Sequence, residues 1–116
     1  MQMLANYLVG FVALLHVYFM VLEMFLWDKP LGLKTFGHSR DVAKVTKTLA
    51  MNQGLYNGFL AAGLGWGLVS GSESFKLFFL GCVVVAGVFG GLTASRKILY
   101  IQALPAAVAL ALLLLV

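Results

Sequence analysis

Residues 49–63, LAMNQGLYNGFLAAG, decide how the rest of the chain has to be arranged. The stretch reads as part of a membrane-spanning segment, yet its first half carries four polar side chains: Asn52, Gln53, Tyr56 and Asn57. Hydrocarbon offers no hydrogen-bond partners, so a polar group there needs one inside the protein. The sequence therefore predicts a cluster of polar side chains inside a helical membrane protein.

Two pairs of glycines predict close packing between helices. Gly54 and Gly58 stand four residues apart in the same stretch, and Gly87 and Gly91 repeat that spacing further along the chain. Small residues at this spacing let the backbone of a neighbouring helix come close in lipid. We expect all four glycines to be packing residues.

The composition indicates one membrane domain, residues 1–116. Hydrophobic residues make up 62% of the chain and charged residues 10%, against roughly 25% charged in ordinary soluble domains. The net charge of +4 lacks the basic, aromatic-rich face of a nucleic-acid binder. The single cysteine, Cys82, lies in an apolar run and favours neither a disulfide nor a metal cluster. Phosphate-loop and nucleotide motifs are missing, so we expect no cofactor and no metal.

Four apolar segments are predicted to cross the membrane, at about residues 3–27, 48–69, 75–95 and 98–116. A helix of about 20 residues spans roughly 30 Å of hydrocarbon. The short connections after the second and third segments favour antiparallel neighbours. We therefore expect an all-α protein, a four-transmembrane-helix antiparallel bundle.

Basic residues predict the orientation of this bundle. The first connection, residues 28–47, carries five basic residues against Asp28 and Asp41, a net charge of +3. Together with Arg96 and Lys97 in the third connection, it holds seven of the eight basic residues. The positive-inside rule places both connections in the cytoplasm and both termini outside.

Local signals give the course of the chain between spans. Pro30 and Gly32 are expected to break the helix after the first span. Ser39 is a candidate N-cap, and residues 40–47 are expected to form helical turns that continue into the second span. Pro105 is expected to kink the last helix.

Two ionisable side chains inside the first span point to a site. Glu23 and His16 are seven residues apart, close to two helical turns, so they share a face. A carboxylate near the bilayer centre costs about 2.5 kcal/mol or more and is usually functional or paired. Counting depth from the basic ends places Glu23 level with Asn52, Gln53 and Gln102, and His16 level with Tyr56 and Asn57. The expected ligand-binding residues are Glu23, His16, Asn52, Gln53, Tyr56, Asn57 and Gln102.

Each of these residues also has a structural interpretation. Glu23 could hold a proton or a cationic ligand, or it could pair with Lys44 or Lys47 near the membrane surface. His16 could relay a proton or make a structural hydrogen bond to Tyr56 or Asn57. The amides could serve only as contacts between helices, worth about 0.6 kcal/mol each.

Two blocks of sequence resemble a known family. HVYFMVLEMFLW at residues 16–27 and LAMNQGLYNGFLAAGL at residues 49–64 are similar to the signature blocks of the DUF1304 family, small bacterial integral membrane proteins of unknown function. The resemblance implies four spans in the bacterial inner membrane and brings no established activity. The family pattern falls on His16, Glu23, Trp27, Asn52, Gln53, Gly54, Tyr56, Asn57 and Gly58.

A weaker likeness in plan, to the small multidrug resistance transporters, rests on four spans and one glutamate in the first span. The chain departs from those transporters in its longer first connection, its one-sided basic bias and its missing aromatic motifs.

Three functions stay open on this evidence. The chain could be a small-molecule or proton-coupled transporter or binding protein with a pocket that opens to the cytoplasm. It could be a structural or partner-binding subunit, in which the polar cluster only fixes helix packing. It could also be a membrane enzyme that uses Glu23 and His16 on an apolar substrate. The expected partners are membrane lipid, a small molecule and further copies of the chain in a homo-oligomer.

Overall fold

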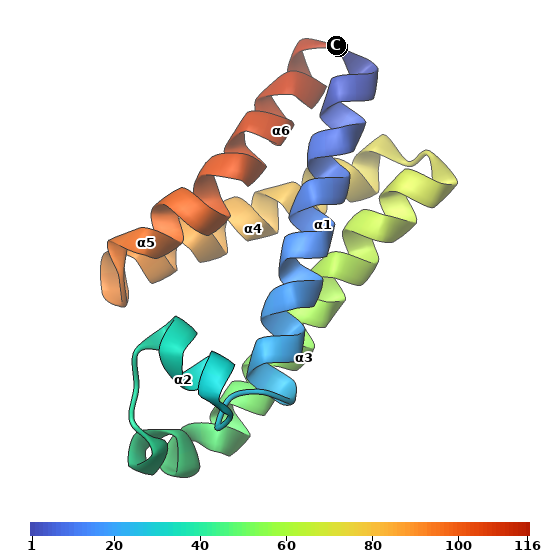
Figure 1. Cartoon of the computed structure of the whole chain (residues 1–116). Coiled ribbons are helices and arrows are strands. Elements are labelled where there is room, and N and C mark those ends of the chain that lie inside the picture. The colour runs from blue at the N-terminus through green and yellow to red at the C-terminus, as the bar shows by residue number, and fades with distance from the viewer. The chain divides into compact units, whose positions relative to one another are not determined.

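The computed structural model describes all 116 residues, and every regular segment in it is helical (Figure 1). The expected all-α class is therefore confirmed. In chain order the elements are α1 (Gln2–Met24), α2 (Pro30–Phe36), α3 (Arg40–Ser70), α4 (Glu73–Thr93), α5 (Arg96–Ile98), the π-helix η1 (Leu99–Ala103) and α6 (Leu104–Leu115).

Three helical stretches are long and apolar enough to cross a membrane, Gln2–Met24, Glu73–Thr93 and Arg96–Leu115. These stretches coincide with the first, third and fourth expected spans and indicate a membrane protein. The second expected span, 48–69, lies within α3, which is helical throughout but less apolar. The count of four spans and the outside location of the termini therefore stay predictions.

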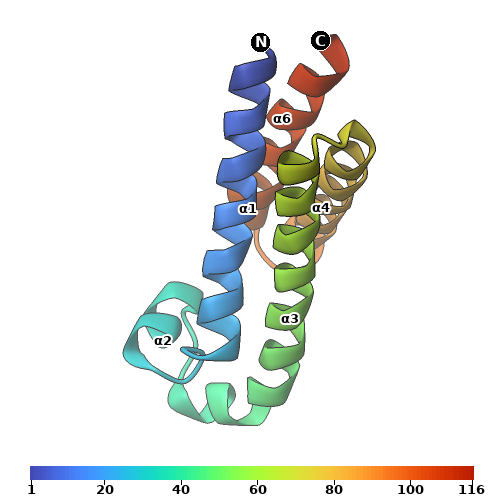
Figure 2. The same cartoon turned by 90° about the vertical axis from the view of Figure 1, so that its right-hand side faces the viewer.

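The helices form two compact units. Unit 1 contains Met1–Leu14 and Leu60–Val116, and unit 2 contains Leu15–Phe59. Because α1 and α3 cross these boundaries, each contributes residues to both units. The two termini lie at the same end of unit 1 (Figure 2).

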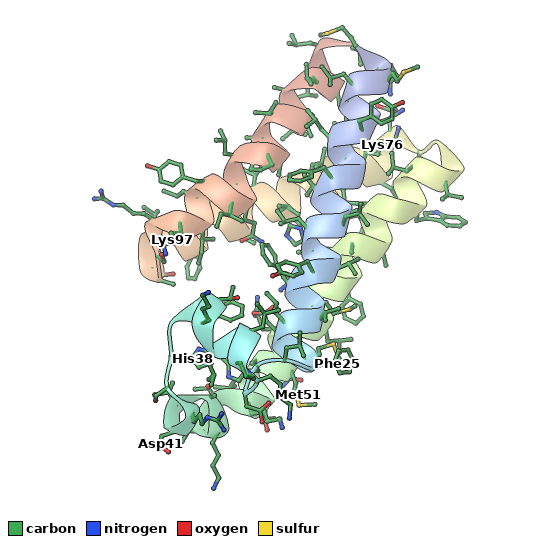
Figure 3. The ribbon with its side chains drawn as sticks, in the orientation of Figure 1. Phe25, His38, Asp41, Met51, Lys76 and Lys97 are labelled. Atoms are coloured by element: carbon green, nitrogen blue, oxygen red, sulfur yellow. The ribbon has the colours of Figure 1, made fainter.

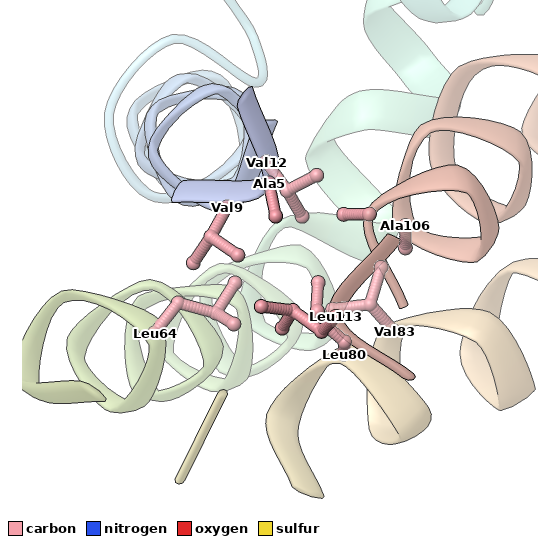
Figure 4. Close-up of a cluster of buried hydrophobic side chains, with 9 residues drawn as sticks. Ala5, Val9, Val12, Leu64, Leu80, Val83, Ala106 and Leu113 are labelled. Atoms are coloured by element: carbon pink, nitrogen blue, oxygen red, sulfur yellow. The ribbon is translucent and has the colours of Figure 1, made fainter. Parts of the chain in front are cut away.

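A hydrophobic core fills unit 1, where α1, α3, α4 and α6 each contribute side chains at helical spacing (Figure 4). Its buried members are Ala5, Val9, Val12, Leu64, Leu80, Val83, Ala106, Ala109 and Leu113. Several of them are small, which allows close van der Waals packing between helices, the main attraction available in lipid.

Glycines on α4 allow its close contact with the chain that follows. A Cβ atom at Gly87 would lie 2.6 Å from the backbone nitrogen of Ala103, and one at Gly90 would lie 3.0 Å from Cγ2 of Ile98. A Cβ at Gly91 would collide with the side chain of Leu99. The backbone of α4 thus packs directly against α5 and η1.

A π-helix precedes Pro105, and the kink expected at that residue stays a prediction. Proline has no backbone N–H, so the carbonyl of Ile101 cannot accept its usual helical hydrogen bond. The backbone N–H of Leu104 donates to the carbonyl of Leu99, five residues earlier. One wide turn therefore absorbs the missing bond before α6 continues.

Within unit 2, α1 ends at Met24, three residues earlier than the expected end at residue 27. The chain then turns into α2, which the sequence analysis did not foresee, although Pro30 at its first turn and Gly37 just beyond its end are helix boundary signals. Gly37 has φ 68°, a left-handed conformation that favours glycine. Gly32 packs against the carbonyls of residues 26 and 27, where no side chain fits.

The helix α3 begins at Arg40, and Ser39 caps it by accepting a hydrogen bond from the backbone N–H of Val42 at 3.2 Å. The expected turns over 40–47 and the second expected span are one continuous helix. Its 31 residues correspond to about 46 Å, longer than the roughly 30 Å of hydrocarbon in a bilayer.

Polar contacts join the end of α1 to the first turns of α3. The indole N–H of Trp27 donates to the hydroxyl of Thr46 at 3.0 Å. The ammonium of Lys47 donates to Oδ2 of Asp28 at 3.1 Å. The Nε2 of His38 lies 3.2 Å from the carbonyl of Trp27, which accepts its hydrogen bond. These contacts join both ends of the segment that contains α2 to each other and to the first turns of α3.

Replacing Gly87 by Ala should destabilise the protein by about 1–3 kcal/mol, because its Cβ would push α4 away from Ala103. Gly81→Ala is the matched control on the same helix, because a Cβ there meets nothing within 4 Å. Thermal unfolding in detergent should show a lower midpoint for Gly87→Ala and an unchanged or higher one for Gly81→Ala. Equal effects of the two substitutions would contradict the packing.

The ion pair of Asp28 and Lys47 should make stability depend on pH at the acidic end. The hydrogen bond from Lys47 lowers the pKa of Asp28 below its ordinary value of 3.8. The pair therefore stabilises the fold above pH 3.8, and its contribution is lost as the pH falls through the lower folded-state pKa. In urea unfolding, the free energy of unfolding of wild type should exceed that of Asp28→Asn at pH 6. The two free energies should become equal at a pH below the folded-state pKa of Asp28. A gap that stays constant with pH would refute this.

Candidate functional site

One hydrogen bond in unit 2 joins Glu23, the carboxylate that the sequence analysis singled out, to one of the amides expected to take part in its site. Asn57, on α3, donates through Nδ2 to Oε1 of Glu23, on α1. Asn57 is 6% exposed, and Glu23 is half-buried. The structure therefore brings the carboxylate of the first expected span into direct contact with an amide of the second.

Glycines on either side of Asn57 permit this contact. A Cβ at Gly54 would lie 2.6 Å from Cγ of Met24 and 3.1 Å from Cβ of Glu23. A Cβ at Gly58 would lie 2.8 Å from the sulfur of Met20. The short side chain of Asn57 reaches the carboxylate because the helix backbones approach this closely.

The geometry allows the carboxyl group of Glu23 to change its protonation state without losing its partner. A carboxylate accepts through both oxygens, and a protonated carboxyl still accepts through its carbonyl oxygen. The bond from Asn57 uses Oε1. A proton or a cation can therefore bind at Oε2 while Asn57 stays in place.

The structure does not assemble the whole polar layer that depth along the spans predicted. Asn52 and Gln53 are exposed, and Tyr56 is 55% exposed, with its ring against Phe59. At about 100° per residue, Asn52 lies about 140° and Tyr56 about 100° around the helix from Asn57. The depth count placed Asn52 and Gln53 level with Glu23 and placed Asn57 level with His16, and it ignored this angle. The contact of Asn57 with Glu23 corrects that assignment.

The other two predicted residues have different surroundings. His16 is fully buried, and its ring meets that of Phe19 edge to face, with centroids 5.4 Å apart. At 1.5 Å per residue, it lies about 10 Å along α1 from Glu23. Gln102 is half-buried in η1, within unit 1. The part of both residues in a site stays a prediction.

A second polar cluster, in unit 1, was missed by the sequence analysis. Lys76 is only 3% exposed, and its ammonium donates to Oδ1 of Asn6 at 2.9 Å and to Oε1 of Glu73 at 2.8 Å (Figure 3). Its stem passes over Gly67, where a Cβ would lie 2.9 Å from Cγ of the lysine. The spacing of Glu73 and Lys76, three apart on one helix, was the available signal.

This second cluster connects α1 with α4 through charged and amide groups. The amide of Gln2 also approaches Oε1 of Glu73, at 3.4 Å. Lysine is rarely this buried unless its charge is paired and hydrogen-bonded. The hydrogen bonds to Asn6 and Glu73 meet this condition for Lys76.

Comparison with known proteins identifies relatives but no activity. A family model described as a protein of unknown function (DUF1304) matches residues 10–114. A relative from Lactococcus lactis subsp. lactis (strain IL1403), described as the uncharacterized protein YpaA, is 29% identical over 95 residues, which cover 78% of this chain and 80% of the relative. No solved structure matches the chain.

Removing the amide of Asn57 should destabilise the protein far more than removing that of Asn52. Asn57→Ala leaves Glu23 without its donor, at a cost of about 1–3 kcal/mol. Asn52→Ala changes an exposed position and should stay within about 0.5 kcal/mol of wild type. Unfolding of the three proteins in the same detergent measures both values. Similar losses for the two alanine variants would show that the Glu23 contact does not stabilise the fold.

Proposed function

We propose that this chain, which belongs to the DUF1304 family, is a small membrane transporter or binding protein in which Glu23 holds a proton or a small cationic molecule. The observation that carries the proposal is the half-buried carboxylate of Glu23, on a helix apolar enough to span a membrane, with a buried amide donating to one oxygen. An ionisable group in a membrane span is costly and is most often paired or functional.

The charge of Glu23 gives the class of ligand. An ionised carboxylate is an acceptor only, so its natural ligands are a proton, an ammonium group or another cation. Binding of a proton or of a cation neutralises the carboxylate, which is favourable in a medium of low polarity. Because either one removes the charge that attracts the other, the proton and the cation compete for Glu23. That competition is the physical basis of proton-coupled transport.

The expected orientation places this site close to the cytoplasm. Glu23 lies four residues before Trp27, and the basic residues 28–47 follow directly. The positive-inside rule puts that connection in the cytoplasm of a bacterial inner membrane. A ligand would then reach Glu23 from the cytoplasmic side.

Exposed polar groups on α3 support assembly into a homo-oligomer. Asn52 and Tyr56 lie about 140° and 100° around α3 from Asn57, and Gln53, four residues before Asn57 and close to its face, is exposed as well. Polar groups that face lipid need partners. Amides are both donors and acceptors, so the same face of a second copy could satisfy them. A chain of this size is also small for a permeation path of its own, and a second copy would enlarge it.

A structural role is the second candidate, and the Glu23–Asn57 bond itself favours it. With Gly54 and Gly58 in contact with α1, the same bond fixes the register of the two helices. A membrane enzyme based on Glu23 and His16 has less support, because the two lie about 10 Å apart along α1.

Binding of tetraphenylphosphonium in weak buffer separates these functions. Wild type should release about one proton for each cation bound, because both compete for Glu23. Glu23→Gln keeps an acceptor for Asn57 and should fold, but it should bind at least tenfold more weakly and release no proton. Gly81→Ala, in unit 1, is the control. Unchanged binding and proton release in Glu23→Gln would favour the structural role.

A further inference from the structure

The short helix α2 is a firmly placed element of unit 2. Gly32 packs against the carbonyl groups of Leu26 and Trp27 with no space for a side chain. The rings of Trp27 and Phe36 lie 4.8 Å apart, and those of Trp27 and His38 lie 4.3 Å apart. These contacts determine which face of α2 points outward.

The outward face of α2 combines an apolar side chain with basic ones. Leu31 is 46% exposed, and Lys34, three residues later, is exposed on the same side of the helix. Lys29, just before the helix, is exposed as well. Apolar and basic side chains on one face are typical of helices that lie in the membrane interface.

The first turns of α3 also expose both kinds of side chain. Val45 is 83% exposed, and Arg40 and Lys44, four residues apart on a neighbouring face, are exposed as well. Lys47 differs from them, because Asp28 already engages its ammonium at 3.1 Å. Since α3 is about 15 Å longer than the hydrocarbon is thick, its charged first turns extend beyond the hydrocarbon.

The level of the bilayer follows from α1. This candidate span ends at Met24, and α2 begins at Pro30, only six residues later. Trp27, between them, is of a residue type enriched where hydrocarbon meets headgroups. Residues 28–47 therefore lie at the membrane surface, whichever side of the membrane that is.

We propose that residues 28–47 form a basic surface that binds the headgroups of anionic phospholipids. Lys29, Lys34, Arg40 and Lys44 would contact the phosphates through their ammonium and guanidinium groups. Leu31 and Val45 would enter the boundary with the acyl chains, where long basic side chains also place their stems. These two apolar side chains select a bilayer lipid over a free phosphate, which gives them no apolar contact.

This inference is independent of the function of Glu23. It rests on charge, with five basic residues against Asp28 and Asp41, and on continuity with the span that ends at Met24. Its consequence is that anionic lipid holds three parts of unit 2 at a fixed depth in the membrane. These are the last turn of α1, the helix α2 and the first turns of α3.

Quenching of Trp27 by brominated lipids tests the proposal. In a Trp66→Phe background Trp27 is the single tryptophan. The protein is placed in vesicles of ordinary phosphatidylcholine. To these a varied fraction of either brominated phosphatidylglycerol, which is anionic, or brominated phosphatidylcholine, which has no net charge, is added. Quenching should occur at a much lower fraction of the anionic lipid, and the preference should fall about fivefold for each basic residue removed, the ratio equivalent to about 1 kcal/mol.

Two double variants of equal charge make the test specific. Lys29→Gln with Lys34→Gln should reduce the preference about 25-fold, from about fivefold per charge. Arg96→Gln with Lys97→Gln removes the same charge from another turn and should leave it almost unchanged. Leu31→Ser keeps every charge and should weaken the quenching by both lipids.

Three results would overturn the proposal. One is a wild-type protein that shows no preference for the anionic lipid. Another is an equal loss in the two double variants, which would indicate a general surface potential in place of a defined binding surface. The third is loss of the preference for anionic lipid when millimolar glycerol phosphate is added in a low-salt buffer, while sodium chloride at the same ionic strength leaves that preference unchanged. This result would indicate a site for free phosphate.

Discussion

The lack of hydrogen-bond partners in hydrocarbon is the constraint on which this structure depends. In unit 2 the carboxylate of Glu23 meets the amide of Asn57, and in unit 1 the ammonium of Lys76 meets Asn6 and Glu73. The Glu23–Asn57 contact joins α1 to α3, and the Asn6–Lys76 contact joins α1 to α4. The polar groups that are hardest to place in lipid are thus the ones that connect the helices.

Glycine has a specific purpose beside both clusters. Gly54 and Gly58 bring α3 close enough to α1 for the short side chain of Asn57 to reach Glu23. Gly67 leaves space for the stem of Lys76. In a soluble protein these glycines would weaken a helix, by about 1 kcal/mol each relative to alanine. Here they allow hydrogen bonds that compensate for polar groups in an apolar medium.

The description of the DUF1304 family names no activity, so the function has to be inferred from the residues of the site. The two proposals concern the same unit. Glu23 is the ionisable group on the final turn of α1, and the surface of residues 28–47 begins just beyond that helix. Lipid contacts at that surface would fix the depth of the carboxylate, and depth determines how readily a proton or a cation reaches it.

The sequence by itself determined the helical class, three of the apolar spans and the cap at Ser39, because these depend on composition and on local backbone chemistry. Only the tertiary structure decided that Asn57, and not Asn52, meets the carboxylate, and that Lys76 is buried. Depth can be counted along one chain. The direction of a side chain around its helix determines its contacts only once a neighbouring helix packs against one face. Which face is packed depends on the arrangement of all the helices.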